Sequence, residues 1–295
     1  MYPWFTSLHT KLLHNAAEQR LHHALLIAAK PGMGKHDFVQ QLASDLLCHQ
    51  PLVSGACGQC QSCHLNVAHS HPDRYHVVSE KQISVTDIRS ALSKLLEHAQ
   101  LGQRKVLIIE NADTMTESAA NALLKTLEEP TQHTYILLTV NAIERLLPTI
   151  LSRCEKNTVA MPHPQLINDW LMEQHNVSAA HDFIRAYQYA PLSIAHALVN
   201  APDSNFLSFK QDLLAVKQQQ MNTIQFGNKW HATAYQCLGW LQLLLHSKMQ
   251  KATEADAKAK CMHNYQVVLH EMQRVHHQGT NKRLVLSHVI DKVMR

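Results

Sequence analysis

The sequence lacks the features of a membrane-spanning or secreted protein. None of its apolar runs approaches the length that a membrane-spanning helix needs. Its first residues show no charged segment followed by an apolar one, so no secretory signal peptide is predicted. We therefore expect a cytoplasmic protein with no membrane partner, in which the seven cysteines stay reduced.

A strong excess of one charge is also missing. The formal net charge is only +4 at pH 7, which is too small to indicate that the chain binds nucleic acid by itself. No low-complexity linker and no internal repeat interrupts the 295 residues. With 45% hydrophobic and 17% charged residues, the composition is that of a globular protein of two or three domains.

Strand-like segments are confined to the first half of the chain. The predicted strands lie at residues 24–28, 75–78, 106–109, 135–140 and 158–161. Between them, the spacing of apolar residues predicts helices at 37–47, 85–99 and 117–129. Strands that alternate with helices indicate an α/β domain with a mostly parallel sheet.

The remainder of the chain carries only helical patterns. Apolar spacing predicts helices throughout 166–199 and 206–295, and residues 202–204 are the expected break between two helical parts. We therefore expect three domains, with an α/β domain at 1–161, a small helical domain at 162–203 and an all-α domain at 204–295.

A phosphate-binding loop with two altered positions follows the first strand. Gly32, Gly34 and Lys35 match the pattern G-x-x-x-x-G-K-[S/T], and a helix begins after them. Such loops hold phosphates with backbone N–H groups and a lysine. Ala29 replaces the first glycine, and His36 replaces the Ser/Thr whose hydroxyl binds magnesium. The sequence therefore predicts a nucleotide site that has lost part of its function.

A second change affects the end of the strand at 106–109. In P-loop ATPases this strand ends in an aspartate that holds magnesium, and a glutamate that activates water usually follows. Here the two positions are Glu110, one methylene longer, and Asn111, which cannot act as a base. Together with His36, these changes favour a protein that does not hydrolyse ATP.

Cysteine spacing predicts a metal site. The chain has four cysteines in one short segment: Cys48, Cys57, Cys60 and Cys63. Four thiolates in a cytosolic protein suit tetrahedral, structural zinc, so we expect a zinc module at about residues 48–64. Cys48 is the most distant ligand, and His64 or His69 would be its substitute. The alternative is a loop of unliganded thiols.

Several segments together resemble one protein family. They are residues 20–26, the cysteine cluster, the helix at 119–130 and the Ser-Arg-Cys sequence at 152–154. On these segments the chain resembles the delta-prime subunits of the bacterial DNA polymerase III clamp loader, which belong to the AAA+ superfamily. The resemblance spans the first half of the chain. It implies an AAA+ P-loop domain, a helical lid and an all-α collar.

The resemblance gives the Ser-Arg-Cys sequence a role. In clamp loaders its arginine, here Arg153 between Ser152 and Cys154, reaches into the ATP site of a neighbouring subunit. A guanidinium there neutralises charge on the transferred phosphoryl group. The implied partners are the gamma/tau and delta subunits in a hetero-oligomeric ring. The resemblance also implies contact with the sliding clamp and primed DNA through that ring.

The resemblance also shows what this chain has lost. Asn141 takes the place of a polar sensor of the γ-phosphate, whereas Ala195 replaces the sensor arginine of the lid. Because Gly32, Gly34 and Lys35 remain, ATP binding is expected to be vestigial or absent.

The leading hypothesis is a non-hydrolysing clamp-loader subunit that acts in DNA replication. We expect no independent catalysis, although the holoenzyme around it is a DNA-directed DNA polymerase, a nucleotidyltransferase. Two alternatives are a self-sufficient AAA+ ATPase and a zinc-containing module that binds nucleic acid. Against the second, aromatic residues are not interleaved with Lys and Arg around the cysteines.

Overall fold

The structure is a computed structural model that describes residues 1–79, 81–102, 104–275, 277 and 279–294. They form two compact units. The N-terminal unit comprises Met1–Trp170 and Ala190–Leu192, and the C-terminal unit comprises Leu171–Tyr189 and Ser193–Arg295.

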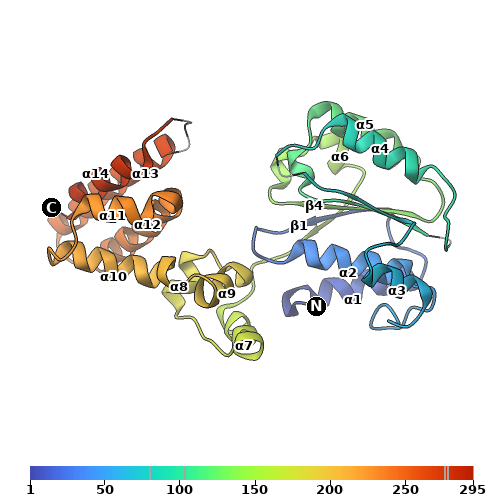
Figure 1. The fold of residues 1–295 in the computed structure, drawn as a ribbon, viewed down its shortest axis with the longest axis horizontal. Helices are drawn as coiled ribbons and strands as arrows, with labels where there is room; N and C mark the ends of the chain where they lie inside the picture. Colours follow the sequence, from blue (N-terminus) through green and yellow to red (C-terminus); the bar gives the residue numbers. More distant parts are fainter. Residues whose placement is uncertain (80, 103, 276, 278, 295) are drawn as a thin grey trace. The chain divides into compact units, whose positions relative to one another are not determined.

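A five-stranded parallel sheet is the centre of the N-terminal unit, with the strand order β2-β3-β4-β1-β5 (Figure 1). The strands are β1 (Ala24–Ala28), β2 (Arg74–Val77), β3 (Lys105–Ile109), β4 (Thr134–Val140) and β5 (Glu155–Thr158). Because all strands run in parallel, the loops that follow β1, β3 and β4 meet at one edge of the sheet, where ligands of such folds bind.

The sheet is covered by helices on both faces (Figure 1). Leu25 and Ile27 of β1 point into one apolar cluster with α1 (Thr6–Ala17) and α2 (Lys35–Leu47). The alternate residue Leu26 points into the cluster on the other face, with α4 (Val85–Leu95) and α5 (Glu117–Glu128). Every residue of β1 and β3 is buried, as expected for strands packed on both sides.

Shorter elements complete this unit. They are η1 (Pro3–Phe5), α3 (Gln61–Val67), η2 (Ala112–Thr114), η3 (Ile143–Arg145) and α6 (Pro148–Leu151), and α7 (Pro164–His175) follows. Side chains cap two of the helices. Ser84 forms a capping box at the start of α4, and the Thr116 hydroxyl accepts the Ala119 N–H at the start of α5.

The predicted α/β class is confirmed, and two predicted bounds are wrong. The fifth strand lies at Glu155–Thr158, not at 158–161, because its polar residues pair in register with the buried strand β1. The helix α4 ends at Leu95, not at 99. Beyond it the ammonium of Lys105 donates to the carbonyls of Leu95 and Glu97, which satisfies acceptors at the helix end.

The C-terminal unit is helical throughout its described residues. After α7 its helices are α8 (His181–Ala186), α9 (Pro191–Val199), α10 (Phe206–Lys217), α11 (Thr223–Trp230), α12 (Ala234–Lys251), α13 (Ala255–Val275) and α14 (Lys282–Met294). Two short turns, η4 (Pro202–Ser204) and η5 (His231–Thr233), join them. The predicted helical second half is therefore confirmed, whereas its division at 203/204 into two domains stays a prediction.

Aromatic rings and one close backbone approach hold this unit together. Phe209 and Trp230 lie 5.6 Å apart between centroids, and Trp230 and Trp240 lie 6.1 Å apart, each pair edge to face. The helix α11 packs closely on α14 at Gly227, where a Cβ atom would lie 2.6 Å from the carbonyl oxygen of Arg283.

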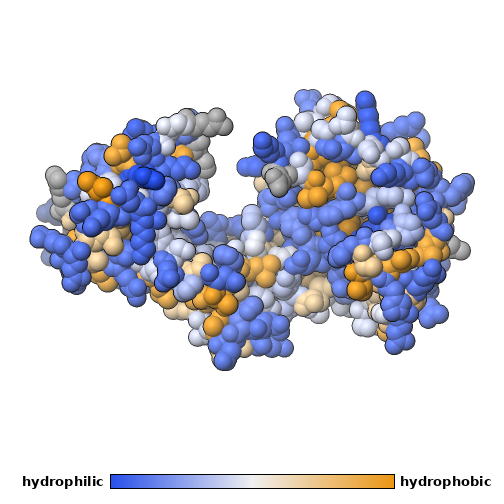
Figure 2. Space-filling view, in the orientation of Figure 1, coloured by the Kyte–Doolittle hydropathy of each residue, from blue (hydrophilic) through white to orange (hydrophobic). Residues whose placement is uncertain are grey.

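Hydrophilic residues cover most of the face shown in Figure 2, and hydrophobic ones form separate smaller patches. Among the described residues, no helix is both long enough and apolar enough to cross a membrane.

Candidate functional site

The phosphate loop, residues 29–36, connects β1 to α2. Gly32 and Gly34 adopt φ angles of 76° and 82°, a region that favours glycine. Lys35 is the first residue of α2 and is 2% exposed. The loop therefore keeps the strand–glycine–helix geometry of a P-loop although its sequence is altered.

Lys35 is engaged with the protein itself. Its Nζ atom donates to Oδ1 of Asn141 at 2.7 Å, and Nδ2 of Asn141 donates to Oδ1 of Asn111 at 3.2 Å. Burial lowers the pKa of Lys35, and the charges of Asp113 and Glu110 partly offset that effect. In a P-loop this lysine contacts phosphate. Here it is the first member of a row of hydrogen-bonded polar side chains that follow β3 and β4.

Three aromatic residues, which we call the aromatic cap, lie against the phosphate loop: Tyr2, Trp4 and Trp170. Tyr2 and Trp4 stack with centroids 5.2 Å apart, and Trp170 meets both rings edge to face. Nε1 of Trp4 donates to the carbonyl of Met33 at 2.7 Å. The Tyr2 ring lies directly over Gly34, where even a Cβ atom would overlap it.

Further contacts attach the cap to the loop. The Tyr2 hydroxyl donates to Oδ2 of Asp37 at 2.6 Å, and burial together with this hydrogen bond raises the pKa of Tyr2 to about 12. The backbone N–H of Leu192 donates to the carbonyl of Gly32 at 3.0 Å. Aromatic side chains therefore pack directly against the glycines of the loop.

The positions that would bind magnesium form a histidine–carboxylate cluster. Glu110 lies between two imidazoles, with Nδ1 of His36 2.9 Å from Oε2 and Nε2 of His76 2.9 Å from Oε1. Nδ1 of His36 is close enough to Glu110 for an ion pair, but the two groups are not aligned for a hydrogen bond. Nε2 of Gln40 also donates to Oε1 of Glu110 at 2.9 Å.

This environment changes the acidity of Glu110. Its contacts with His36 and then His76 hold the pKa of the carboxyl well below its usual range, although burial opposes that shift. Glu110 is therefore ionised, but both of its oxygens are already occupied by side chains of the chain itself. Magnesium, which prefers oxygen ligands, would have to displace imidazoles to bind there.

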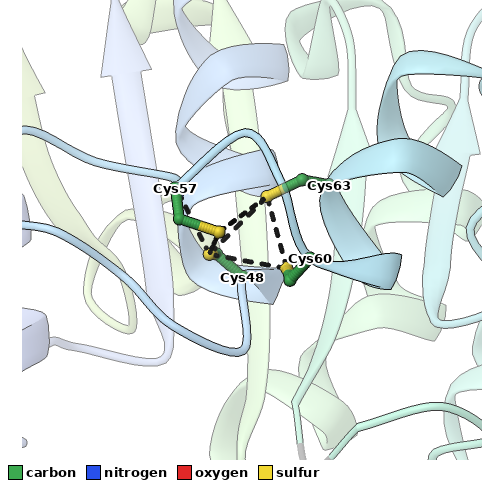
Figure 3. Close-up of side chains that lie close together, drawn as sticks. All are labelled: Cys48, Cys57, Cys60 and Cys63. Carbon is green, nitrogen blue, oxygen red and sulfur yellow. Dashed lines mark hydrogen bonds between the residues drawn. The ribbon is translucent and has the colours of Figure 1, made fainter.

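The four cysteines converge on one point (Figure 3). Their sulfur atoms lie 3.5–3.9 Å apart in the pairs Cys48–Cys57, Cys48–Cys60, Cys48–Cys63, Cys57–Cys63 and Cys60–Cys63. Four sulfurs placed tetrahedrally about 2.3 Å from a zinc ion would be about 3.8 Å apart. The cluster thus has the size of a tetrahedral zinc–thiolate site.

Local structure places each cysteine. Cys48 follows the last residue of α2, Cys60 is the N-cap of α3, and Cys63 lies in the first turn of that helix. Cys57 comes from the intervening loop, which turns at Gly58 with φ of 74°. Cys48 thus lies beside the other three cysteines. Among the described residues, the candidate metal ligands found at this place are these four cysteines and include no histidine.

The thiols differ in acidity when no cation is beside them. Burial raises the pKa of Cys63 to about 12. Burial also opposes ionisation of Cys60, yet hydrogen bonds from the backbone of Cys63 and His49 lower its pKa to about 6. The donor set fits a soft cation, since a cation would stabilise the four thiolates that otherwise repel one another.

A buried carboxylate, Asp45, supports the loop that carries the cysteines. Its Oδ1 atom accepts the backbone N–H of Ala56 at 2.8 Å and Nε2 of Gln41 at 3.0 Å. Its Oδ2 atom lies 2.7 Å from Nε2 of His9 in α1. Gly55 passes so close that a Cβ atom there would lie 2.6 Å from Oδ1. Asp45 therefore joins α1, α2 and the cysteine loop.

Arg153 lies just after α6, on the surface of the N-terminal unit. Its side chain is 33% exposed, and Nη2 lies 2.5 Å from Oε1 of Glu128 at the end of α5. Nη1 donates to the carbonyl of Thr149 at 2.8 Å and to the Ser152 hydroxyl at 3.2 Å. Cys154, in contrast, is buried in the core, and burial raises its pKa to about 11.

The predicted site residues therefore fall into separate groups. Lys35, Asn111 and Asn141 meet at the ends of β1, β3 and β4, and the four cysteines meet beyond α2. Ala195 is buried in α9 of the C-terminal unit. The sequence analysis missed the aromatic cap, Asp45 and Glu128. Of these, only the aromatic cap has a sequence signal, because Tyr2 and Trp4 stand close together near the start of the chain.

Comparison with known proteins identifies the family of this chain. The profile of the family described as "DNA polymerase III, delta subunit" matches residues 6–162, more than half of the 295 residues. The delta' subunit of DNA polymerase III from Escherichia coli is 42% identical over 180 residues, which cover 60% of this chain and 54% of that protein. The delta' subunit from Bacillus subtilis is 38% identical over 169 residues, which cover 56% and 50%.

The chain thus spans about half the length of the curated relatives it matches. A solved structure of a DNA polymerase III gamma subunit-related protein from Thermotoga maritima superposes with a TM-score of 0.50 over 97% of each chain. At 19% identity, that likeness supports the fold alone. By the extent of its family match and its similarity to these subunits, the chain belongs to the DNA polymerase III delta subunit family, and the relatives named here are delta' subunits.

Proposed function

We propose that this chain is a non-hydrolysing subunit of a bacterial clamp loader. It would assemble with gamma/tau and delta subunits into a hetero-oligomeric ring and donate Arg153 to the ATP site of a neighbouring subunit. Through that ring it would help to load the sliding clamp onto primed DNA. The observation that carries the proposal is the pairing of a covered phosphate loop with a surface arginine next to Ser152.

The loop supports the non-hydrolysing part of this proposal. Tyr2 lies over Gly34, and Lys35 is hydrogen-bonded to Asn141. The positions of the magnesium ligands hold His36 and Glu110, which contact each other. A nucleotide would have to displace the aromatic cap, free the lysine and bind magnesium without the hydroxyl ligand of a P-loop.

The arginine supports the part that acts in trans. The contacts of Arg153 use three of its five N–H donors, so two remain for phosphate oxygens. A planar guanidinium that meets two phosphate oxygens stabilises charge in phosphoryl transfer better than an ammonium does. Ser152 and Cys154 would position this residue, the first by its hydroxyl and the second by its burial.

The same assembly gives the remaining parts structural roles. We propose that Cys48, Cys57, Cys60 and Cys63 hold one structural zinc ion in a module at about residues 48–64. Such a site closes all four metal positions with protein ligands and leaves none for chemistry. We further propose an AAA+ P-loop-like domain at 1–161, a lid at 162–203 and a collar at 204–295 that makes oligomer contacts.

The isolated chain tests the first part. We expect no steady-state phosphate release from ATP by the purified protein, with or without primed DNA. Turnover of about one per second or more, which is ordinary for enzymes, would instead support a self-sufficient ATPase.

The reconstituted complex tests the second part. Arg153→Ala should leave this subunit folded, because the ion pair that it removes is partly exposed and such pairs contribute only about 0.2–1 kcal/mol. In the complex, clamp-stimulated ATP hydrolysis should fall. An arginine finger contributes on the order of 10³ at its own site, so the total loss is partial if other sites of the ring still turn over. Arg153→Lys should restore only part of the rate.

The matched control is Arg145→Ala, which removes another exposed arginine of the same unit. It should leave the rate unchanged. Equal rates for wild-type and Arg153→Ala complexes of the same composition would mean that Arg153 does not act in trans.

A further inference from the structure

The guanidinium of Arg153 is held by an acidic residue that the proposed function does not use. Glu128 stands at the last position of α5, and its Oε1 atom lies 2.5 Å from Nη2 of Arg153. Both side chains are partly exposed, at 48% and 33%. The adjacent carboxylate, Glu129, is exposed and makes no ion pair within the described part of the chain. One of two neighbouring acidic residues thus contacts the arginine selectively.

This contact competes with phosphate. A guanidinium paired with a carboxylate carries no net charge as a pair, so it neutralises less of the charge that develops during phosphoryl transfer. The arginine therefore has to leave Glu128, at least in part, when it contacts a nucleotide on a neighbour.

The remaining contacts of Arg153 do not have this effect. Thr149 offers a backbone carbonyl and Ser152 a hydroxyl, and both are neutral acceptors on α6 or next to it. Because they are neutral, they do not offset the positive charge of the guanidinium. Of the contacts that the described residues make with the guanidinium, the one with Glu128 opposes its charge.

We propose that Glu128 is a positioning residue that restrains Arg153 until the guanidinium engages the nucleotide of a neighbouring subunit. This inference rests on the proposed role of Arg153 in trans. In this role Glu128 acts through Arg153, the residue that it contacts. Its effect is to keep the neighbour's hydrolysis slow while the two subunits are not closely apposed.

Glu128→Gln tests the restraint in the reconstituted complex. It keeps the size of the side chain and removes its charge. We expect the clamp-independent kcat for ATP to rise about 1.5- to 5-fold, which is the rate equivalent of an exposed ion pair. The KM for ATP should stay unchanged, because the arginine acts on the transition state. Glu129→Gln is the matched control and should leave both constants unchanged.

A double variant shows whether the effect passes through the arginine. When Arg153→Ala is present, Glu128→Gln should have no further effect on kcat. If Arg153→Ala itself leaves the rate of the complex unchanged, the proposed function fails. If Arg153→Ala lowers the rate but Glu128→Gln and Glu129→Gln have the same kcat, only the restraint by Glu128 is refuted. A fall in kcat in Glu128→Gln would also overturn it, since Glu128 would then orient the arginine for its task.

Discussion

Replacement of Gly34 by alanine tests whether the aromatic cap is part of the folded N-terminal unit. Gly34 has φ of 82°, so any other residue there is strained. The new methyl group would overlap Cε2 of Tyr2 and lie 2.6 Å from Cδ2, so the ring has to move. Gly34→Ala therefore combines backbone strain with the loss of Tyr2 contacts.

The two contributions can be estimated separately. The left-handed conformation costs an alanine about 1–2 kcal/mol. Displacement of Tyr2 breaks its stacking on Trp4 and its hydrogen bond to Asp37, which together contribute about 1–2 kcal/mol. Gly34→Ala should thus lower the free energy of unfolding by about 2–4 kcal/mol. In a Tyr2→Ala background only the backbone part, about 1–2 kcal/mol, remains.

The measurement is a double-mutant cycle read by hydrogen exchange of the amides in β1 and α2. We expect a coupling of about 1–2 kcal/mol between Gly34→Ala and Tyr2→Ala. Gly279→Ala, read by the amides of α14, is the backbone control, because Gly279 has φ of 93° and open space around its Cα atom. Additivity within about 0.5 kcal/mol would mean that Tyr2 does not pack on the loop in solution.

Three further predictions concern the cysteine cluster and Glu110. Elemental analysis should find one zinc per chain, and Cys60→Ser should lower the melting temperature of the N-terminal unit because metal binding is coupled to folding; equal melting curves would contradict this. Asp45→Ala should weaken zinc binding about 10- to 100-fold in a chelator competition, since it removes the oxygen that accepts the Ala56 N–H, and an unchanged affinity would remove Asp45 from that role. Glu110→Gln should destabilise the chain at neutral pH: since the folded-state pKa of Glu110 is lowered, its stabilisation is present above the ordinary carboxyl pKa of about 4.3 and is lost as pH falls through the folded value. Urea titrations of both proteins should therefore differ at pH 7 and at pH 5.5 and converge only in stronger acid, and a difference confined to high pH would contradict the reasoning.

The fold was predictable where apolar pattern alone decides structure. The strands β1, β3 and β4 are short apolar runs, and their central positions in the sheet bury both faces. The strand β5 was misplaced because Glu155, Lys156 and Asn157 carry no apolar signal. Its position follows from pairing with Leu25 and Leu26, which a single sequence does not reveal.

The candidate site was predictable only where residue type and spacing carry the chemistry. Cysteine spacing indicated the cluster, and the altered loop indicated that Lys35 no longer has its usual surroundings. The contact of Tyr2 with Gly34 joins residues far apart in sequence, and neither residue type points to the other. The pairing of Glu128 with Arg153 depends in the same way on how α5 packs on α6.

The central position of β1 in the sheet has a consequence for biosynthesis. Ala24 of β1 pairs with Ile136 of β4, and Leu25 of β1 pairs with Glu155 of β5. The first strand of the sheet to be synthesised therefore pairs only with the last two. At about 5–20 residues per second, the interval between the synthesis of β1 and that of β5 lasts roughly 7–25 s. Until β4 is complete at Val140, the apolar β1 has neither neighbour, whereas β2 and β3 can already pair. A nascent chain that stops before residue 155 would therefore expose one edge of β1, and an unpaired apolar strand edge favours aggregation.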